Sequence, residues 1–448
     1  MNSAVLLAIL WQCHSGILLP GAGMTDKQDE AAVEAIIANA VHDAGSDRPW
    51  TFDRSDYSGD LSELPIGVFD SGIGGLTVLE AILSLDVHNN VSRAPGSDGL
   101  PDFQNERFFY LGDQANMPYG NYAPAGKVPF LRELILKDAT FLLGRRYWPS
   151  VEAKRPASDK PPVKAIVIAC NTATAYGLDD VRHAIQSWGV PVVVVGVVEA
   201  GARGVLEHRR KSGSENSVAV LATVGTCSSN AYPRSIERAL GLAGQRTPRI
   251  VQKGFVELAG AIEGDAAFSG SSSVEDYIRR DIRSLLDGFA GSEASPPIDS
   301  VVLGCTHFPL VKDQLISAFA ELRQEEINGK FPYRELVAEQ IAIIDPAELT
   351  ARELYRELAS RRLQARVPSG DEKNRPQNRF YISVANPQCP QAQIAADGGL
   401  TTAYKYGRTA SRLDVEDTVV VPMVADKLPA SGLKLIQTKL PHVWKSMQ

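Results

Sequence analysis

The sequence is poor in cysteine, and its cysteines follow no structural pattern. The five cysteines lie at positions 13, 170, 227, 305 and 389. They include no C-x-x-C pair, and no histidine lies at the spacing typical of a zinc site. An odd and sparse set of this kind excludes a disulfide framework and indicates reduced thiols in a cytosolic protein.

Positive charge is also scarce, and the amino-terminal apolar run is short. The chain has 46 Lys and Arg against 53 Asp and Glu, a net charge of −7, with no concentrated basic stripe. We therefore expect no nucleic-acid partner.

The run AVLLAILW at residues 4–11 is too short to span a bilayer, and no Lys or Arg precedes it as in a signal peptide. We expect no membrane partner and a cytoplasmic location, while initiation at Met1 or Met24 stays open.

Strand-like and helical segments alternate from Pro65 onward. The pattern predicts an α/β protein with parallel sheets and helices on both faces. The expected strands are 66–70, 108–113, 165–169, 191–198, 217–223 and 300–304, with two more in FYISVA and DTVVVPMV near the end. Before Pro65 we expect a loosely attached leader with one helix, in EAAVEAIIANAVHDA.

Polar stretches rich in Pro, Ser or Gly interrupt this alternation and indicate surface insertions. They lie at 89–99, at 152–162 and within 268–297, where they surround a helix. A further polar segment at 366–378 precedes the last part of the chain. This last part is predicted to be a small appended unit.

Two of the expected strands end in a thiol followed by polar side chains. AIVIA leads into Cys170, Asn171 and Thr172, and SVVLG leads into Cys305, Thr306 and His307. A lone cysteine after a strand is usually a small core residue. Ligands of parallel α/β sheets, however, bind beyond the carboxyl ends of the strands. The repeated arrangement therefore favours a matched pair of functional thiols.

A glycine-rich turn follows the first expected strand. The segment DSGIGGLT at 70–77 places three glycines before a helix that starts at Leu76. Such a turn lets the backbone approach an anion and exposes N–H groups at a helix amino terminus. A purely structural tight turn is the alternative. A Walker loop is excluded because no G-K-[ST] follows.

Four segments together resemble the glutamate racemase family, within the aspartate/glutamate racemases. They are DSGIGGLTVLEAI, YLGDQANMPYG, IACNTATA and GCTHFPL, in this order, and the resemblance covers about residues 65–360. It implies two pseudo-symmetric parallel-sheet α/β domains with the active site in the cleft between them, plus a small C-terminal extension. The expected boundaries are a leader at 1–64, a first domain at 65–195 completed by 311–362, a second domain at 196–310, and an extension at 363–448.

The resemblance also implies a reaction. Inverting a stereocentre requires a base on one face of the α-carbon and an acid on the other, so two similar groups must exchange roles. Two thiols suit this task if one is activated as the thiolate. The resemblance implies that Cys170 acts on D-glutamate and Cys305 on L-glutamate, assisted by Asp70 and His307. It further implies a cofactor- and metal-independent isomerase that supplies D-glutamate for peptidoglycan, and hence for cell-wall biogenesis and cell shape.

The residues that the resemblance places against the substrate come from all four segments. They are Asp70, Ser71, Tyr119, Gly120, Asn171, Thr172, Thr306 and His307.

Three segments depart from the family pattern. The family's usual proline is Ala200 here, an extra Cys227 stands in VGTCSSNAY, and the segment QKGFVELAGAIEGD matches only loosely. It therefore stays open whether Glu257 or Glu263 assists catalysis.

Other interpretations of the function also remain open. A racemase of aspartate or another acidic amino acid is one alternative, and a non-catalytic regulatory or binding protein on the same fold is another. The oligomeric state, with a homodimer as one option, and the role of the extension are also open.

Overall fold

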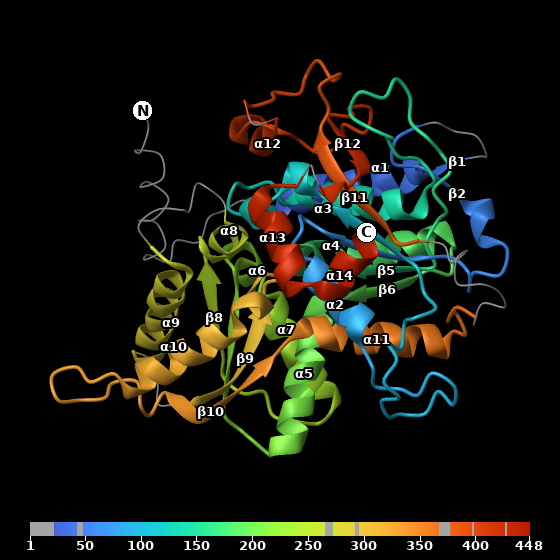
Figure 1. Ribbon diagram of the computed structural model, residues 1–448. Helices are drawn as coiled ribbons and strands as arrows, with labels where there is room; N and C mark the ends of the chain where they lie inside the picture. The colour runs from blue at the N-terminus through green and yellow to red at the C-terminus, as the bar shows by residue number, and fades with distance from the viewer. Residues whose placement is uncertain are drawn as a thin grey trace.

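The computed structural model describes residues 22–42, 48–264, 272–291, 295–366, 377–396, 398–425 and 428–448. Within these ranges the protein is a mixed α/β structure with two largely parallel sheets, as the sequence predicts (Figure 1). The apolar run at 4–11 and parts of two expected insertions, 268–271 and 367–376, lie outside the described residues.

The larger sheet has six strands in the order β12-β11-β4-β3-β5-β6. All neighbours are parallel except β12, which runs antiparallel to β11. The central strands are buried on both faces, which explains why they appear in the sequence as continuous apolar runs. The bounds are β3 Ile66–Asp70, β4 Phe108–Gly112, β5 Ala165–Ile168, β6 Val193–Gly196, β11 Arg379–Ala385 and β12 Thr418–Pro422.

The smaller sheet has four parallel strands in the order β10-β9-β7-β8. Their bounds are β7 Ser217–Thr223, β8 Ile250–Phe255, β9 Ile298–Gly304 and β10 Val337–Ile344. A separate pair of two-residue strands joins β1 Val41–His42 to β2 Phe52–Asp53. Strands β8 and β10 were not expected, because their half-buried, partly polar sequences lack a strong strand pattern.

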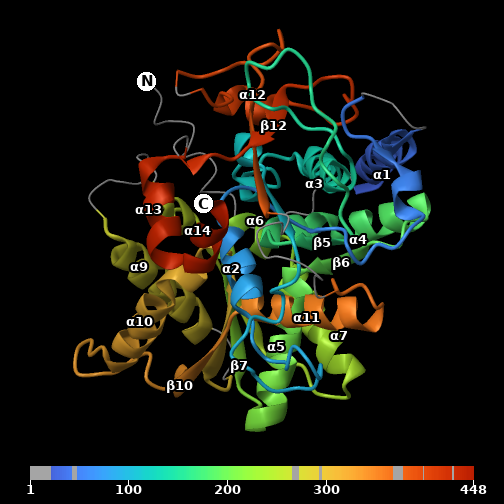
Figure 2. The ribbon, with the colours of Figure 1, turned by 45° about the vertical axis from the view of Figure 1, so that its right-hand side comes forward.

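Helices cover both faces of the larger sheet (Figures 1 and 2). One face packs against α1, α3 and α4, and the other against α2, α11, α13 and α14. The helix bounds are α1 Ala22–Ala40, α2 Leu76–Ser84, α3 Val128–Leu143, α4 Asn171–Trp188, α5 Val197–Ser212, α6 Val224–Ser228, α7 Ala231–Leu242, α8 Leu258–Glu263, α9 Val274–Ala290, α10 Lys312–Gln324, α11 Pro346–Ser360, α12 Thr402–Gly407, α13 Ala430–Lys439 and α14 Pro441–Met447. Short 3-10 turns are η1 Arg54–Tyr57, η2 Gln114–Asn116, η3 Tyr119–Asn121 and η5 Phe308–Val311.

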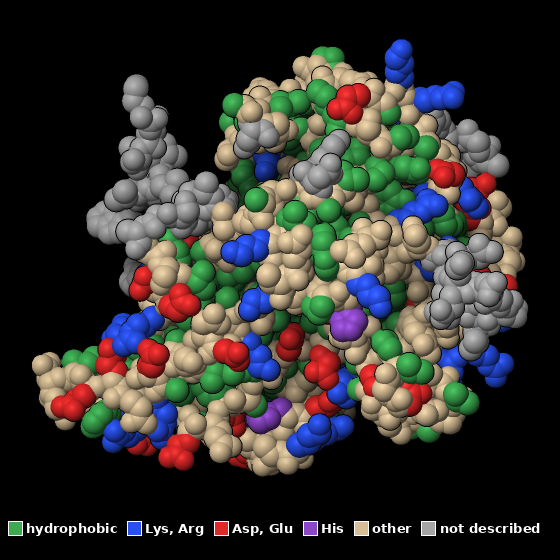
Figure 3. Space-filling view, viewed as in Figure 1, with side chains coloured by type: hydrophobic (Ala, Val, Ile, Leu, Met, Phe, Trp, Pro, Cys, Tyr) green, Lys and Arg blue, Asp and Glu red, His purple; other side chains and the backbone are tan. Residues whose placement is uncertain are grey.

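Charged side chains of both signs gather over α9 and α10 beside the smaller sheet (Figure 3). Arg279 and Arg283 of α9 both reach Glu325, which follows α10. No helix in the described part of the chain is both long and apolar enough to cross a membrane.

The amino-terminal helix lies where the sequence predicts one, but it is not loosely attached. Val33, Ile36 and Ala40 of α1 are buried in the core that contains α3 and α4. The indole N–H of Trp188 donates to the carbonyl oxygen of Ile37 at 2.9 Å. Apolar residues at this helical spacing form one stripe, and burying that stripe docks the helix.

The carboxyl-terminal part is also more integrated than an appended unit. Strand β11 pairs in parallel with β4, so residues 379–385 extend the larger sheet. Without it, the buried strand β4 would have an open edge with unpaired backbone groups. Residues 337–344 lie in the segment 311–362 that was expected to complete the first domain, but they form β10, which pairs with β9 in the smaller sheet. The boundaries between domains otherwise remain a prediction.

Candidate active site

Both thiols of the expected pair lie at the carboxyl ends of strands, one from each sheet. Cys170 follows β5 and is the N-cap of α4, and Cys305 follows β9 directly before η5. Their exposed fractions are 6% and 5%, and both are free cysteines. The two sheets therefore each deliver one buried thiol to the edge where ligands of parallel sheets bind.

Cys170 has neutral neighbours and one carboxyl group. Its Sγ accepts a hydrogen bond from the N–H of Ala173 at 3.4 Å and lies 3.8 Å from Oγ of Ser71. Burial raises the pKa of Cys170 strongly, and the charge of Asp70 raises it further. Cys170 is therefore a protonated thiol in this arrangement.

Asp70 is the last residue of β3 and is 2% exposed. Its Oδ2 accepts from the N–H of Gly72 at 3.0 Å, while Oδ1 has no hydrogen-bond partner among the described residues. Burial raises the pKa of Asp70, although the charge of His307 opposes this shift. A buried carboxyl oxygen without a partner is costly unless a ligand or a proton satisfies it.

The glycine-rich turn lies between Asp70 and His307. A Cβ on Gly75 would lie 2.4 Å from Cβ of Asp70, and a Cβ on Gly74 would lie 2.4 Å from Cε1 of His307. These positions need glycine because other groups approach closely, and not because of a positive φ. Farther along the turn, Thr77 Oγ1 donates to the carbonyl oxygen of Thr306 at 2.9 Å. The turn thus joins the Asp70 segment of one sheet to the Cys305 segment of the other.

Cys305 belongs to a short chain of polar contacts. Its Sγ lies 3.6 Å from Nδ1 of His307, and Nε2 of His307 lies 2.6 Å from Oε1 of Glu263. Burial works against the charged imidazolium, but the carboxylate of Glu263 and the thiol of Cys305 outweigh it and hold the pKa of His307 well above its ordinary range. His307 is therefore an imidazolium beside Cys305.

The sequence did not decide between Glu257 and Glu263, but the structure gives these two glutamates different partners. Glu263, the last residue of α8, is the partner of His307. Glu257 instead pairs with Arg280 at 2.5 Å, on the side of α9. Nothing in the loosely matching segment distinguished these two side chains, because the choice depends on how α8 packs against η5.

The polar residues after Cys170 make contacts with the second sheet's elements. Thr172 Oγ1 lies 3.0 Å from Oγ1 of Thr226 and 3.3 Å from Oγ1 of Thr223. Asn171 Oδ1 accepts from the hydroxyl of Tyr232 at 2.5 Å. The sequence analysis missed Thr223, Thr226 and Tyr232, although the segment VGTCSSNAY around Cys227 contains the last two.

Tyr119 and Gly120 have different surroundings. The Tyr119 hydroxyl lies between carboxyl oxygens of Asp113, at 2.5 Å, and Asp138, at 2.7 Å, inside the first sheet's domain. Gly120 instead packs against Thr223, whose Oγ1 would be 3.2 Å from an added Cβ. The structure thus brings Gly120, but not the hydroxyl of Tyr119, to the threonines near Cys170.

The remaining expected site residues lie close to the thiols. Ser71 follows Asp70 in the turn and contacts Cys170, while Thr306 lies between Cys305 and His307. Among the residues that the structure describes, no group of three or more His, Cys, Asp or Glu is placed to hold a metal ion.

Known proteins are similar in sequence to this chain. The Asp/Glu/Hydantoin racemase family matches residues 147–354. The glutamate racemase of Sulfurihydrogenibium sp. is 30% identical over 285 residues, 63% of this chain and 81% of that relative. This chain belongs to the glutamate racemase family. It is therefore an isomerase of the amino-acid racemase class.

Further relatives of the family extend this comparison. The glutamate racemase of Chlorobaculum parvum is 34% identical over 289 residues, 64% of this chain and 77% of the relative. Solved structures include a glutamate racemase isoform from Bacillus anthracis, with 25% identity, a TM-score of 0.47, and coverage of 72% of this chain and 89% of that one. The glutamate racemase from Francisella tularensis in complex with D-glutamate has the same values.

Proposed function

We propose that this protein interconverts L- and D-glutamate by a two-base mechanism with Cys170 and Cys305 and without pyridoxal phosphate or metal. The observation that supports it best is the glycine-rich turn, which contacts Asp70 beside one thiol and His307 beside the other. Two thiols on either side of one turn suit a substrate whose α-carbon is approached from both faces. The names of the relatives support glutamate as the substrate.

On the D-glutamate side, Cys170 is the base. Its raised pKa means that the thiol must lose its proton before it can act. Asp70 is the adjacent carboxyl group, and one of its buried oxygens has no hydrogen-bond partner among the described residues. We assign Asp70 the role of proton acceptor from Cys170, because this oxygen is free to take up a proton beside the thiol.

On the L-glutamate side, Cys305 is the base. The imidazolium of His307 lies 3.6 Å from the Sγ of Cys305 and is the charged group placed to take part in proton transfer there. Glu263 keeps His307 charged through its 2.6 Å contact. When the reaction runs in the other direction, the same pair returns a proton to the carbanion through Cys305.

Helix termini and small polar side chains provide the binding groups. The first turns of α2 and α4 present backbone N–H groups beside Asp70 and Cys170, and such helix starts favour carboxylates. Ser71, Asn171, Thr172 and Thr306 add hydroxyl and amide groups next to the thiols. Donors fixed in this way stabilise the negative charge that develops when the α-proton leaves.

The cellular role that follows is the supply of D-glutamate for peptidoglycan in the cytoplasm, and hence for cell-wall biogenesis and cell shape. Racemisation of aspartate or another acidic amino acid by the same residues is the second candidate, because the thiols act on the α-carbon and not on the side chain. A homodimer fits the proposal as well as a monomer does.

The decisive experiment follows the α-proton. Purified protein is incubated in D₂O with L-glutamate or L-aspartate, and the α-proton signal and the D-isomer are followed by NMR and chiral chromatography. We expect loss of the α-proton and growth of D-glutamate, unaffected by EDTA or hydroxylamine and abolished by iodoacetamide unless substrate protects. Loss of the α-proton from aspartate but not from glutamate would show that aspartate is the substrate. Full activity after both thiols are alkylated would contradict the mechanism.

A further inference from the structure

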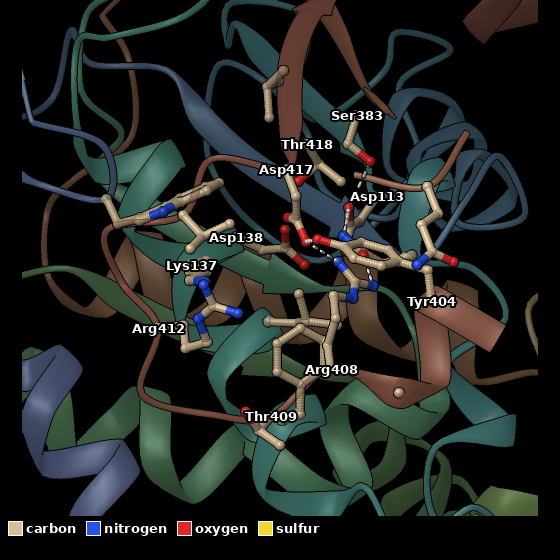
Figure 4. A pocket seen from close by; sticks show the side chains of 18 of the residues that line it. Asp113, Lys137, Asp138, Ser383, Tyr404, Arg408, Thr409, Arg412, Asp417 and Thr418 are labelled. Carbon is tan, nitrogen blue, oxygen red and sulfur yellow. Dashed lines mark hydrogen bonds and ion pairs between the residues drawn. The ribbon is translucent and has the colours of Figure 1, made fainter. Parts of the chain in front are cut away.

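The carboxyl-terminal region encloses a second cavity that the racemase mechanism does not use. It has a volume of about 370 Å³ and lies between α3 and the chain from α12 to β12 (Figure 4). None of the residues that line it is one of the two thiols, Asp70 or His307. Pockets of this size commonly bind small molecules.

The walls of the cavity are largely apolar on the α3 side and at Trp50. Leu134, Val415, Val420 and the rings of Trp50 and Tyr404 line it. These side chains provide surface for an apolar or planar body.

Most of the polar groups in the cavity already have partners. Arg408 pairs with Asp417 at 3.2 Å and donates to Asn116 Oδ1 at 2.5 Å. Lys137 pairs with Glu133 at 2.6 Å. Groups satisfied in this way shape the cavity but leave little capacity for a ligand.

Two buried carboxyl groups, those of Asp113 and Asp138, flank the hydroxyl of Tyr119. The single hydrogen of the Tyr119 hydroxyl cannot serve both Asp113 at 2.5 Å and Asp138 at 2.7 Å, so one carboxyl must itself carry a proton. Burial and the charge of Asp113 raise the pKa of Asp138 well above its ordinary range. Asp138 is therefore neutral and donates to Tyr119, which donates to Asp113. Asp138 does not repel an anion in the cavity.

Two hydrogen-bond donors have no acceptor. Figure 4 shows the side chain of Arg412 reaching into the cavity, and the part of the chain that the structure describes offers it no hydrogen bond or ion pair. The indole Nε1 of Trp50 is buried and also has no acceptor among these residues. The loop that carries Arg412 is held by the N–H of Ser411, which donates to Glu133 Oε2 at 2.5 Å. A guanidinium without a protein partner on an anchored loop at the cavity can bind carboxylate or phosphate oxygens in bidentate fashion.

We propose that this cavity binds a small organic anion, a carboxylate or a phosphate ester with a planar apolar body, whose oxyanion meets Arg412. The apolar body lies against Leu134, Val415 and Val420. Carboxylates and phosphate esters both carry the oxyanion that this site would bind. Probes of each kind distinguish between the two ligand classes.

Binding is expected to reach the racemase site. The Tyr119 hydroxyl that links Asp113 and Asp138 belongs to η3, and the next residue, Gly120, packs against Thr223 near Thr172. A ligand that rearranges the carboxyl pair, which lines the cavity, therefore shifts the turn that contacts Thr223 beside Thr172.

The test is calorimetric titration of the full chain with benzoate and with phenyl phosphate. Benzyl alcohol is the neutral match, and inorganic phosphate is the anion without a body. We expect saturable binding of at least one aromatic anion, one per chain, with weaker binding of both controls. The site is overturned if neither aromatic anion binds. Its ligand class is overturned if benzyl alcohol or inorganic phosphate binds as tightly.

Two variants at exposed positions test the location without disturbing the core. Arg412→Gln removes the cation and is expected to weaken binding about tenfold or more, because a hydrogen bond to a charged group is lost. Ala403→Trp fills the rim and is expected to abolish binding. Arg210→Gln, at an exposed position on α5, is the matched control and should bind as the parent does. Unchanged affinity in both cavity variants would overturn the assignment.

The expected effect of the cavity on the racemase site is tested by a separate kinetic measurement. The KM for glutamate, measured with and without the bound probe, is expected to change in the parent and not in Arg412→Gln. An unchanged KM at saturating probe would overturn the coupling. This readout rests on the proposed racemase function, whereas the calorimetry does not, so failure of one is distinguishable from failure of the other.

Discussion

The two halves of the candidate active site each contain a buried thiol, but the surroundings of the two thiols differ. Cys170 caps a long helix and has a buried carboxyl, Asp70, as its charged neighbour. Cys305 precedes a 3-10 turn and has an imidazolium, His307, held by Glu263. One thiol is thus kept protonated until a base takes its proton, whereas the other lies beside a positive charge.

This difference shows how a site of two similar halves can handle a proton in both directions. In the proposed two-base reaction, one thiol must be deprotonated and the other protonated at the start of each turnover, and the roles must exchange. A buried carboxyl group beside Cys170 and an imidazolium beside Cys305 give the two thiols unlike surroundings for this exchange. The predictions below test whether the two halves are unequal in this way.

The largest effect is expected from removing one thiol at a time. Cys170→Ser should abolish proton removal from D-glutamate, and Cys305→Ser should abolish it from L-glutamate, because a hydroxyl is too weak a base to replace a thiolate. Racemisation should fall by about 10²–10⁴-fold or more in each variant. The half-reactions are separated with β-chloroglutamate, which eliminates HCl after a single deprotonation.

Cys389→Ser is the control for this pair, since Cys389 is free and lies in the carboxyl-terminal region away from the strand ends of the site. It should retain parental rates with both enantiomers. If the Cys170 and Cys305 variants lose both enantiomers equally, the thiols are not opposed bases.

A smaller, directional effect is expected at the charged neighbours. Glu263→Gln should reduce proton removal from L-glutamate more than from D-glutamate, by about a hundredfold at the lower end of general-base effects. Asp70→Asn should show the opposite preference. Initial rates of α-proton exchange in D₂O, measured separately for each enantiomer, report both. Glu257→Gln, which breaks only the contact with Arg280, should leave the two rates unchanged.

The Glu263–His307 pair should also make stability depend on pH. The folded-state pKa of His307 is raised, so its stabilising contribution is complete below the unfolded value of about 6.5 and is lost as pH rises through the folded value. Urea unfolding of the parent and of Glu263→Gln should differ by about 1.5–3 kcal/mol at pH 6. The gap should narrow toward pH 10, and a gap that widens would contradict a charged His307.

The smallest effect is expected where the carboxyl-terminal helix meets the glycine-rich turn. A Cβ on Gly432 of α13 would lie 2.8 Å from Cδ1 of Ile73 in that turn. Gly432→Val should cost about 1 kcal/mol of unfolding free energy by overpacking and should raise the KM for glutamate. Gly241→Val, at a helical glycine with open space around it, is the matched control. Equal effects of the two changes would show that α13 does not press on the turn.

Much of the larger architecture followed from short-range patterns. Continuous apolar runs such as IGVFD and AIVIA predicted buried parallel strands, and the two thiols after such strands predicted the location of the site. The strands β8 and β10 escaped prediction because their side chains are half-buried and the alternation is weak. The docking of α1 also escaped prediction, because an amphipathic stripe shows that a helix buries a face but not which surface covers it.

The sequence by itself determined the strands that lead into the two thiols, the turn glycines and the candidate side chains of the site, because these depend on residue type and local spacing. Only the tertiary structure decided that Glu263 and not Glu257 pairs with His307, that the Tyr119 hydroxyl lies between two aspartates, and that residues 379–385 complete the larger sheet. The cavity around Arg412 likewise exists only in the folded chain. Each of these contacts joins segments distant in sequence, and the packing of helices and sheets, rather than any local preference, brings their side chains within hydrogen-bonding distance.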